Sequence, residues 1–116
     1  MNIESFRDYC IRKKGVNEEF PFDNNTLVFK VGGKLFALTG VDEFDGINLK
    51  GDPEENVQLR EKYDGIQPGY HMNKKHWNTV LTDGSVPDKL IKEMIDKSYE
   101  LVVEGLPKKD REKLKK

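Results

Sequence analysis

Apolar and polar residues alternate in short runs along the chain, and the period of each run predicts a helix or a strand. Ile3, Phe6 and Cys10 repeat at helical spacing, and Asn2 is a suitable N-cap, so residues 2–14 are predicted to form a helix. The apolar stripe of that helix indicates that Cys10 is a small buried hydrophobe rather than a nucleophile.

A β-hairpin is the strongest local prediction, with strands at residues 26–31 and 34–39 joined by Gly32-Gly33. A two-residue turn fixes the expected register, which pairs Val31 with Lys34, Phe29 with Phe36, and Leu27 with Leu38. One face is then strongly apolar. The other face is mixed and carries Val28, Lys30, Leu35 and Ala37.

The next runs predict a strand at residues 46–50 and a helix from Asp52 to about Tyr63. An extended segment at 66–72 and a strand at 77–82 follow. The longest predicted helix starts within residues 85–88 and ends at about Glu104. Phe20 and Phe22 are expected to cover an edge of the core. Helices flanking a mainly antiparallel sheet predict an α+β sandwich. Residues 1–107 are expected to form a single domain, and residues 108–116 a basic, solvated or frayed C-terminal tail.

Charge and cysteine content narrow the classes of partner and compartment. The 116 residues include 20 basic and 21 acidic side chains, for a formal net charge of −1, so any attraction for nucleic acid must come from a local basic patch. A lone cysteine excludes an internal disulfide, and the sequence shows no signal peptide or membrane span. We therefore expect a cytoplasmic protein, monomeric and without contact to a membrane.

The segment from Pro68 to Val80 concentrates unusual chemistry, because it contains both histidines, the only tryptophan and two adjacent lysines. His71 and His76 lack the spacing of a zinc motif, so local hydrogen bonding is favoured over metal binding. Packing in the core is the favoured role for Trp77. Lys74 and Lys75 fit either a solvated basic turn or phosphate contacts. Neutral net charge predicts that any such binding is weak and salt-dependent.

Four motifs, in order, cover nearly the whole chain: Pro21-Phe22 with residues 28–38, residues 48–54, residues 68–80, and residues 98–102 with 106–109. This pattern resembles the MmcQ/YjbR family of small bacterial proteins. The resemblance implies a fold similar to that of CyaY, the bacterial frataxin, and a "double-wing" arrangement that is labelled DNA-binding. A frataxin-like iron role is not favoured, because the first helix is basic near its end instead of forming an acidic ridge.

The leading functional hypothesis is therefore a protein that binds double-stranded DNA through a local basic surface. The candidate residues that the resemblance carries over are Lys30, Lys34, Lys50, His71, Asn73, Lys74, Lys75, His76, Trp77 and Asn78. The alternative is a small-ligand or protein-binding module with a pocket near residues 70–78. No nucleophile–base pair or metal triad is visible, so neither an enzyme nor a cofactor is expected.

Overall fold

The computed structural model describes residues 1–115 as helices packed on an antiparallel sheet. In chain order the elements are α1 (Ile3–Ile11), β1 (Val16–Glu19), β2 (Thr26–Val31), β3 (Lys34–Gly40), β4 (Gly46–Lys50), α2 (Pro53–Lys62), β5 (Ile66–Pro68), β6 (Trp77–Leu81), α3 (Asp88–Glu104) and α4 (Lys108–Leu114).

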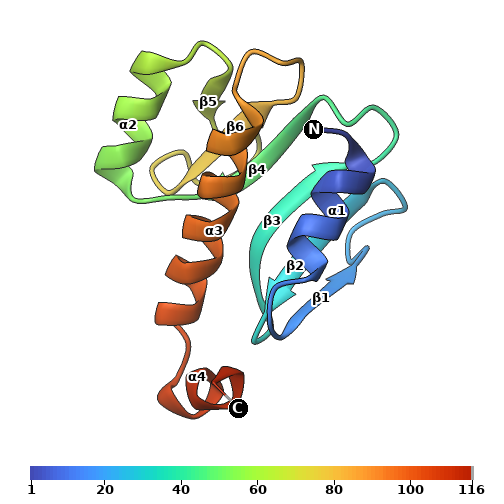
Figure 1. Ribbon diagram of the computed structural model, residues 1–116, viewed down its shortest axis with the longest axis vertical. Helices are drawn as coiled ribbons and strands as arrows, with labels where there is room; N and C mark the ends of the chain where they lie inside the picture. The colour runs from blue at the N-terminus through green and yellow to red at the C-terminus, as the bar shows by residue number, and fades with distance from the viewer. Residues whose placement is uncertain (116) are drawn as a thin grey trace.

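The six strands lie in the order β1-β2-β3-β4-β6-β5, and every neighbouring pair is antiparallel. α1 and α3 lie against one face of this open sheet, and α2 lies beside β5 and β6 (Figure 1). Within residues 1–115 no helix packs on the opposite face. We call it the helix-free face. The predicted α+β class with a mainly antiparallel sheet is confirmed.

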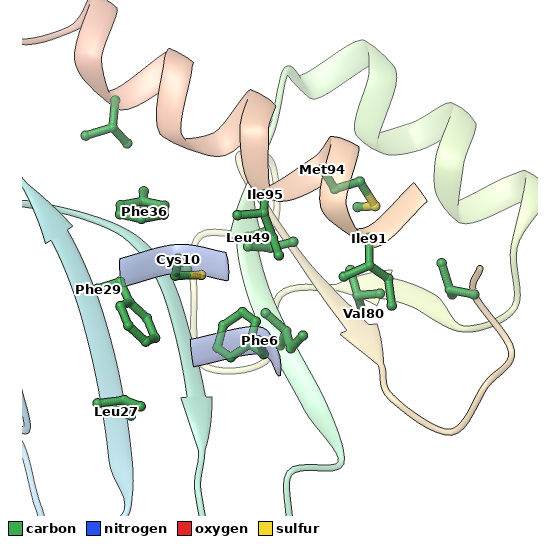
Figure 2. Packing of buried hydrophobic residues seen from close by; sticks show 14 of the residues in the cluster. Phe6, Cys10, Leu27, Phe29, Phe36, Leu49, Val80, Ile91, Met94 and Ile95 are labelled. Carbon is green, nitrogen blue, oxygen red and sulfur yellow. The ribbon is translucent and has the colours of Figure 1, made fainter. Parts of the chain in front are cut away.

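The core fills the space between the sheet and the two central helices. Figure 2 shows Cys10 of α1 near Phe29 and Phe36 of the sheet, and Ile95 of α3 beside Leu49. Phe6 and Phe29 meet edge to face, with ring centroids 5.5 Å apart, which is a favourable aromatic geometry. The apolar periodicity of the first and last long helices therefore identified the residues that bury this layer.

The β2–β3 hairpin forms at the predicted place, but its predicted register is wrong beyond the turn. Val31 pairs with Lys34 as expected, whereas Phe29 pairs with Ala37 and Leu27 with Thr39. A β-bulge inserts one extra residue into β3 and shifts the register. Its consequence is that Phe36 and Ala37 both enter the core cluster, while Leu38 lines the helix-free face.

Three further features of the fold depart from the sequence predictions. The polar run at β1 forms an edge strand that was not predicted; charged side chains are common on such edges. Residues 108–114 form α4 instead of a solvated or frayed tail, and Leu114 packs against the core. Phe20 and Phe22 do not cover the core edge, because 48% and 71% of their surfaces are exposed.

The remaining predicted elements are confirmed within a few residues at their ends. Asp52 caps α2 by accepting hydrogen bonds from the backbone N–H groups of Glu54 and Glu55, each at 3.1 Å, and Pro53 occupies the first turn. Among residues 1–115, no helix is long and apolar enough to cross a bilayer.

Cys10 provides a first test of this packing. Burial raises the pKa of its thiol to about 12, so almost none is ionised near neutral pH. We expect no reaction with an aromatic disulfide reagent in native buffer and complete reaction after unfolding in urea, measured by absorbance. Rapid labelling of the native protein would contradict the packing of α1.

Candidate functional site

The helix-free face carries a hollow of about 530 Å³ over the middle of the sheet. Glycines on two neighbouring strands, Gly40 and Gly46, leave this part of the surface without side chains. The hollow is defined by its lining residues, which are Phe22, Asn25, Thr26, Leu38, Thr39, Gly40, Asp45, Gly46, Asn48, Tyr70, His71, Met72 and Thr79. Its volume is in the range of small-molecule sites, about 300–1,000 Å³.

One wall of the hollow is the loop between β1 and β2, which supplies Phe22 and Asn25. Asp23 shapes this loop by accepting hydrogen bonds from the backbone N–H groups of Asn25 (2.8 Å) and Thr26 (2.6 Å). The amide of Asn25 then reaches across and accepts a hydrogen bond from the backbone N–H of Asp42 at 2.8 Å. These contacts hold the wall while leaving the Phe22 ring in solvent.

The opposite wall is the loop between β5 and β6, which folds back over the sheet. The backbone N–H of Tyr70 donates to Thr79 Oγ1 at 2.9 Å, so this part of the loop lies above β6. The Tyr70 ring is 69% exposed and lies against the His71 ring, with centroids 4.0 Å apart. His71 has a φ of 58°, a left-handed conformation that is uncommon outside glycine and often marks functional sites.

A polar cluster of Asn56, Arg60 and Asn78 supports this loop from the helix side of the sheet. Asn78 is 1% exposed; its Oδ1 accepts a hydrogen bond from Arg60 Nε at 2.6 Å, and its Nδ2 donates to Asn56 Oδ1 at 3.1 Å. Arg60 also donates to the backbone carbonyls of Lys74 and Trp77. The cluster therefore anchors the loop to α2 without sharing the hollow.

The predicted DNA-binding residues are divided by the fold into groups with different surroundings. Asn78 is buried, Trp77 is half-buried and outside the core cluster, and Lys30 pairs with Glu19. Two contacts lie within the β5–β6 loop: Lys74 Nζ donates to the Gly69 carbonyl at 3.0 Å, and the Asn73 side chain accepts from the backbone N–H groups of Lys75 and His76. The His76 carbonyl accepts a hydrogen bond from the backbone N–H of Gly51, which follows β4. Only His71 of the candidate set lines the hollow. Lys34, Lys50 and Lys75 lie elsewhere on the surface.

Several residues of the site were not predicted from the sequence. Asn48 and Thr79 face each other across β4 and β6, and Phe22 and Asn25 come from a loop that was assigned to the core edge. Strand alternation supplied one usable signal, since Thr79 and Asn78 must point to opposite faces of β6. The i, i+4 spacing of Asn56 and Arg60 is a second usable signal in the sequence, because it places both side chains on one side of α2.

The role of Asp23 in shaping the wall predicts a pH dependence. Hydrogen bonds from the backbone of Thr26 and then Asn25 lower the pKa of its carboxyl below the ordinary value of 3.8. A lowered folded-state pKa means that the stabilisation is complete above the unfolded pKa and is lost as pH falls through the folded pKa. Asp23→Asn is thus expected to be less stable than the parent at neutral pH, with the difference shrinking below about pH 4. Urea unfolding across this range measures it; a constant difference would contradict the assignment.

Comparisons with known proteins identify the family of this chain. A model of the YjbR family matches residues 11–101. The chain belongs to the YjbR family. YjbR of Escherichia coli K12 is 36% identical over 115 residues and covers 98% of each chain; YbdF of Escherichia coli O157:H7 is 41% identical over 99 residues, covering 83% of this chain and 80% of its own. Both relatives are described as uncharacterized.

Solved structures agree with the YjbR assignment. A crystal structure of a Deinococcus radiodurans protein with a DUF419 domain is 42% identical, with a TM-score of 0.91, and the match covers 97% of this chain and 87% of that one. A Pseudomonas syringae protein is 34% identical, with a TM-score of 0.74 and coverage of 87% and 98%. Every residue that lines the hollow falls within the segment that matches the YjbR model, whereas α4 lies outside it.

Proposed function

We propose that this YjbR-family protein is a small-molecule-binding module whose ligand site is the hollow on the helix-free face. The observation that carries the proposal is the pair of exposed aromatic rings, Phe22 and Tyr70, held on opposite walls of one cavity. Large exposed aromatic side chains at a concave site commonly contact ligands. The role proposed is binding rather than catalysis.

The construction of the two walls supports the same function. Each wall is fixed by hydrogen bonds that leave its aromatic ring free: Asp23 holds the loop beneath Phe22, and Thr79 holds the backbone of Tyr70. A preformed cavity of this kind loses less entropy on binding than a flexible loop does. The left-handed conformation of His71 adds local strain at the site, as is common where structure serves function.

Saturation-transfer difference NMR with a library of small planar fragments tests the proposal. We expect fragments to bind the parent protein, and binding to weaken about tenfold or more in a Phe22→Ala/Tyr70→Ala variant, since stacking on an aromatic ring is worth about 1–3 kcal/mol. Phe20→Ala is the matched control, because Phe20 is also exposed but does not line the hollow. Equal losses in both variants, or no fragment binding at all, would contradict the proposal.

DNA binding is the second candidate, favoured by one specific observation. Lys34 and Lys50 line the same shallow groove beside the end of α3, and Lys75 is exposed near α2. In the described part of the chain none of these three lysines forms an ion pair. Unpaired surface lysines are suited to phosphate contacts.

Fluorescence anisotropy with duplex DNA at low and physiological salt distinguishes this candidate. A Lys34→Ala/Lys50→Ala/Lys75→Ala variant should lose most of the binding seen at low salt. A variant with three alanines at Lys109, Lys113 and Lys115 removes the same charge from the region of α4 and should lose less. DNA binding is ruled out as the function if the parent does not bind at low salt, or if the two variants behave alike.

A further inference from the structure

The hollow contains an amide whose orientation is fixed by a chain of hydrogen bonds. The backbone N–H of Tyr70 can only donate, so Thr79 Oγ1 accepts from it. Thr79 in turn donates its hydroxyl proton to Asn48 Oδ1. The Nδ2 group of Asn48 forms no hydrogen bond within the described chain, and Asn48 lines the hollow. This amide presents a free donor to any occupant.

A second amide is oriented by the same logic on the other wall. The backbone N–H of Asp42 donates to Asn25 Oδ1, which places Nδ2 on the far side of that side chain. Nδ2 of Asn25 lies 3.4 Å from the point where a Cβ at Gly40 would stand. It therefore projects over the bare floor of the hollow. Two N–H donor groups thus face one cavity.

The spacing of these donors limits the shape of the occupant. Leu38 pairs with Asn48, so Gly40, two residues further along β3, is a diagonal neighbour of Asn48. Diagonal neighbours on one face of a sheet lie about 7–8 Å apart. The strand positions of Gly40 and Asn48 are therefore separated by a distance comparable to the length of a one- or two-ring heterocycle. The rings of Phe22 and Tyr70 provide the faces between which such a plane can lie.

The charges of the residues that line the hollow further limit the chemical class of the ligand. Among the residues that line the hollow, the carboxylate of Asp45 is the one fixed charge, and no lysine or arginine is present in this described set. A phosphate or carboxylate would meet repulsion without a compensating cation. The Asp45 carboxylate can instead accept hydrogen bonds from the N–H groups of a ligand. The lining therefore offers donors to carbonyl oxygens, an acceptor to ring N–H groups, and aromatic faces to a planar ring.

We propose that the hollow binds an uncharged planar oxo-heterocycle of the oxopurine, pterin or pyrimidine class, with a carbonyl oxygen and a second ring acceptor (a ring nitrogen or another carbonyl oxygen) receiving hydrogen bonds from Asn48 Nδ2 and Asn25 Nδ2. This inference rests on the proposed small-molecule function and specifies its ligand. The same chemistry is available from a free base or nucleoside and from an unpaired base in a single strand of nucleic acid.

Titrations followed by ¹H–¹⁵N NMR, including the side-chain amide signals, test the inference. The probes are guanosine, pterin and indole; indole is planar but lacks a carbonyl acceptor. Guanosine or pterin is expected to shift the Asn25 and Asn48 side-chain amides and to bind at least about tenfold more tightly than indole. Guanosine monophosphate should bind more weakly than guanosine. A single-stranded oligonucleotide serves as a separate arm, and salt-dependent binding tighter than that of guanosine would identify nucleic acid as the source of the base.

Asn48→Asp tests the donor directly, because the carboxylate still accepts from Thr79 but offers no N–H to the ligand. We expect at least about a tenfold loss of guanosine or pterin affinity. Asn73→Asp is the matched control. This substitution introduces the same charge outside the hollow, and the Asn73 side chain acts only as a hydrogen-bond acceptor in its turn. Unchanged binding by Asn48→Asp, or indole binding as tightly as the heterocycles, would overturn the ligand class while leaving the hollow as a binding site. If neither the heterocycles nor indole shift the lining residues, the ligand class and the proposed function both fail.

Discussion

Asn78→Ala is expected to lower the free energy of unfolding by about 2–4 kcal/mol, the largest effect of any single polar substitution near the site. Asn78 is 1% exposed and bonds both Arg60 Nε and Asn56 Oδ1. Its removal leaves a guanidinium donor and an amide oxygen without partners at a buried position. Such orphaned groups lose their hydration on folding and regain nothing in return. Urea unfolding followed by circular dichroism measures the change.

Asn17→Ala provides the control for that measurement. Asn17 also lies in a strand, but it is exposed on the edge strand β1 and its side chain makes no hydrogen bond in the described residues. Its replacement should change stability by less than about 0.5 kcal/mol. If Asn78→Ala costs no more than Asn17→Ala, the polar cluster does not stabilise the β5–β6 loop as the structure indicates.

Gly40→Leu is expected to abolish ligand binding in the hollow, with a loss of about a hundredfold or more, because the new side chain occupies the cavity. Gly40 lies in β3 on the helix-free face, its φ is not in the left-handed region, and a Cβ would meet Asn25 Nδ2 at 3.4 Å. The substitution therefore fits the backbone. Stability should change by no more than about 1 kcal/mol, because a strand glycine is itself unfavourable.

Gly105→Leu is the control, since it adds the same side chain at the end of α3, away from the hollow, and its backbone is right-handed. Isothermal titration with the tightest-binding heterocycle compares the two variants with the parent. Binding retained by Gly40→Leu would show that the ligand lies elsewhere. Binding lost equally in both variants would indicate an indirect effect on folding.

The sequence was sufficient for the elements whose determinants are local. Gly32-Gly33 placed the hairpin turn, Asp52 and Pro53 placed the start of α2, and apolar periodicity found the buried side of α3. The register of β3 was not accessible in this way. The bulge allows Phe36 and Ala37 to share the core, and that preference arises from packing against other elements, not from the turn.

The candidate site shows the same limit more clearly. Residues 68–80 were recognised as one motif, but strand pairing directs Asn78 into the structure and Thr79 to the helix-free face. The opposite wall comes from Phe22 and Asn25, which precede β6 by about fifty residues of chain. A cavity formed by two loops that meet only in the folded sheet has no signature in either loop alone. Of the candidate DNA-binding residues, His71 alone lines it, whereas the alternative prediction of a pocket near residues 70–78 also covers Tyr70 and Met72, which line it as well.

A crystal structure of the protein soaked with pterin or guanosine is the most direct test of the hollow as a ligand site. We expect electron density for the heterocycle between Phe22 and Tyr70, above Gly40 and Gly46, with its carbonyl oxygen and a ring nitrogen within hydrogen-bond distance of Asn25 and Asn48. Density in the groove lined by Lys34 and Lys50, or an empty hollow in a crystal whose protein binds the same compound in solution, would contradict it.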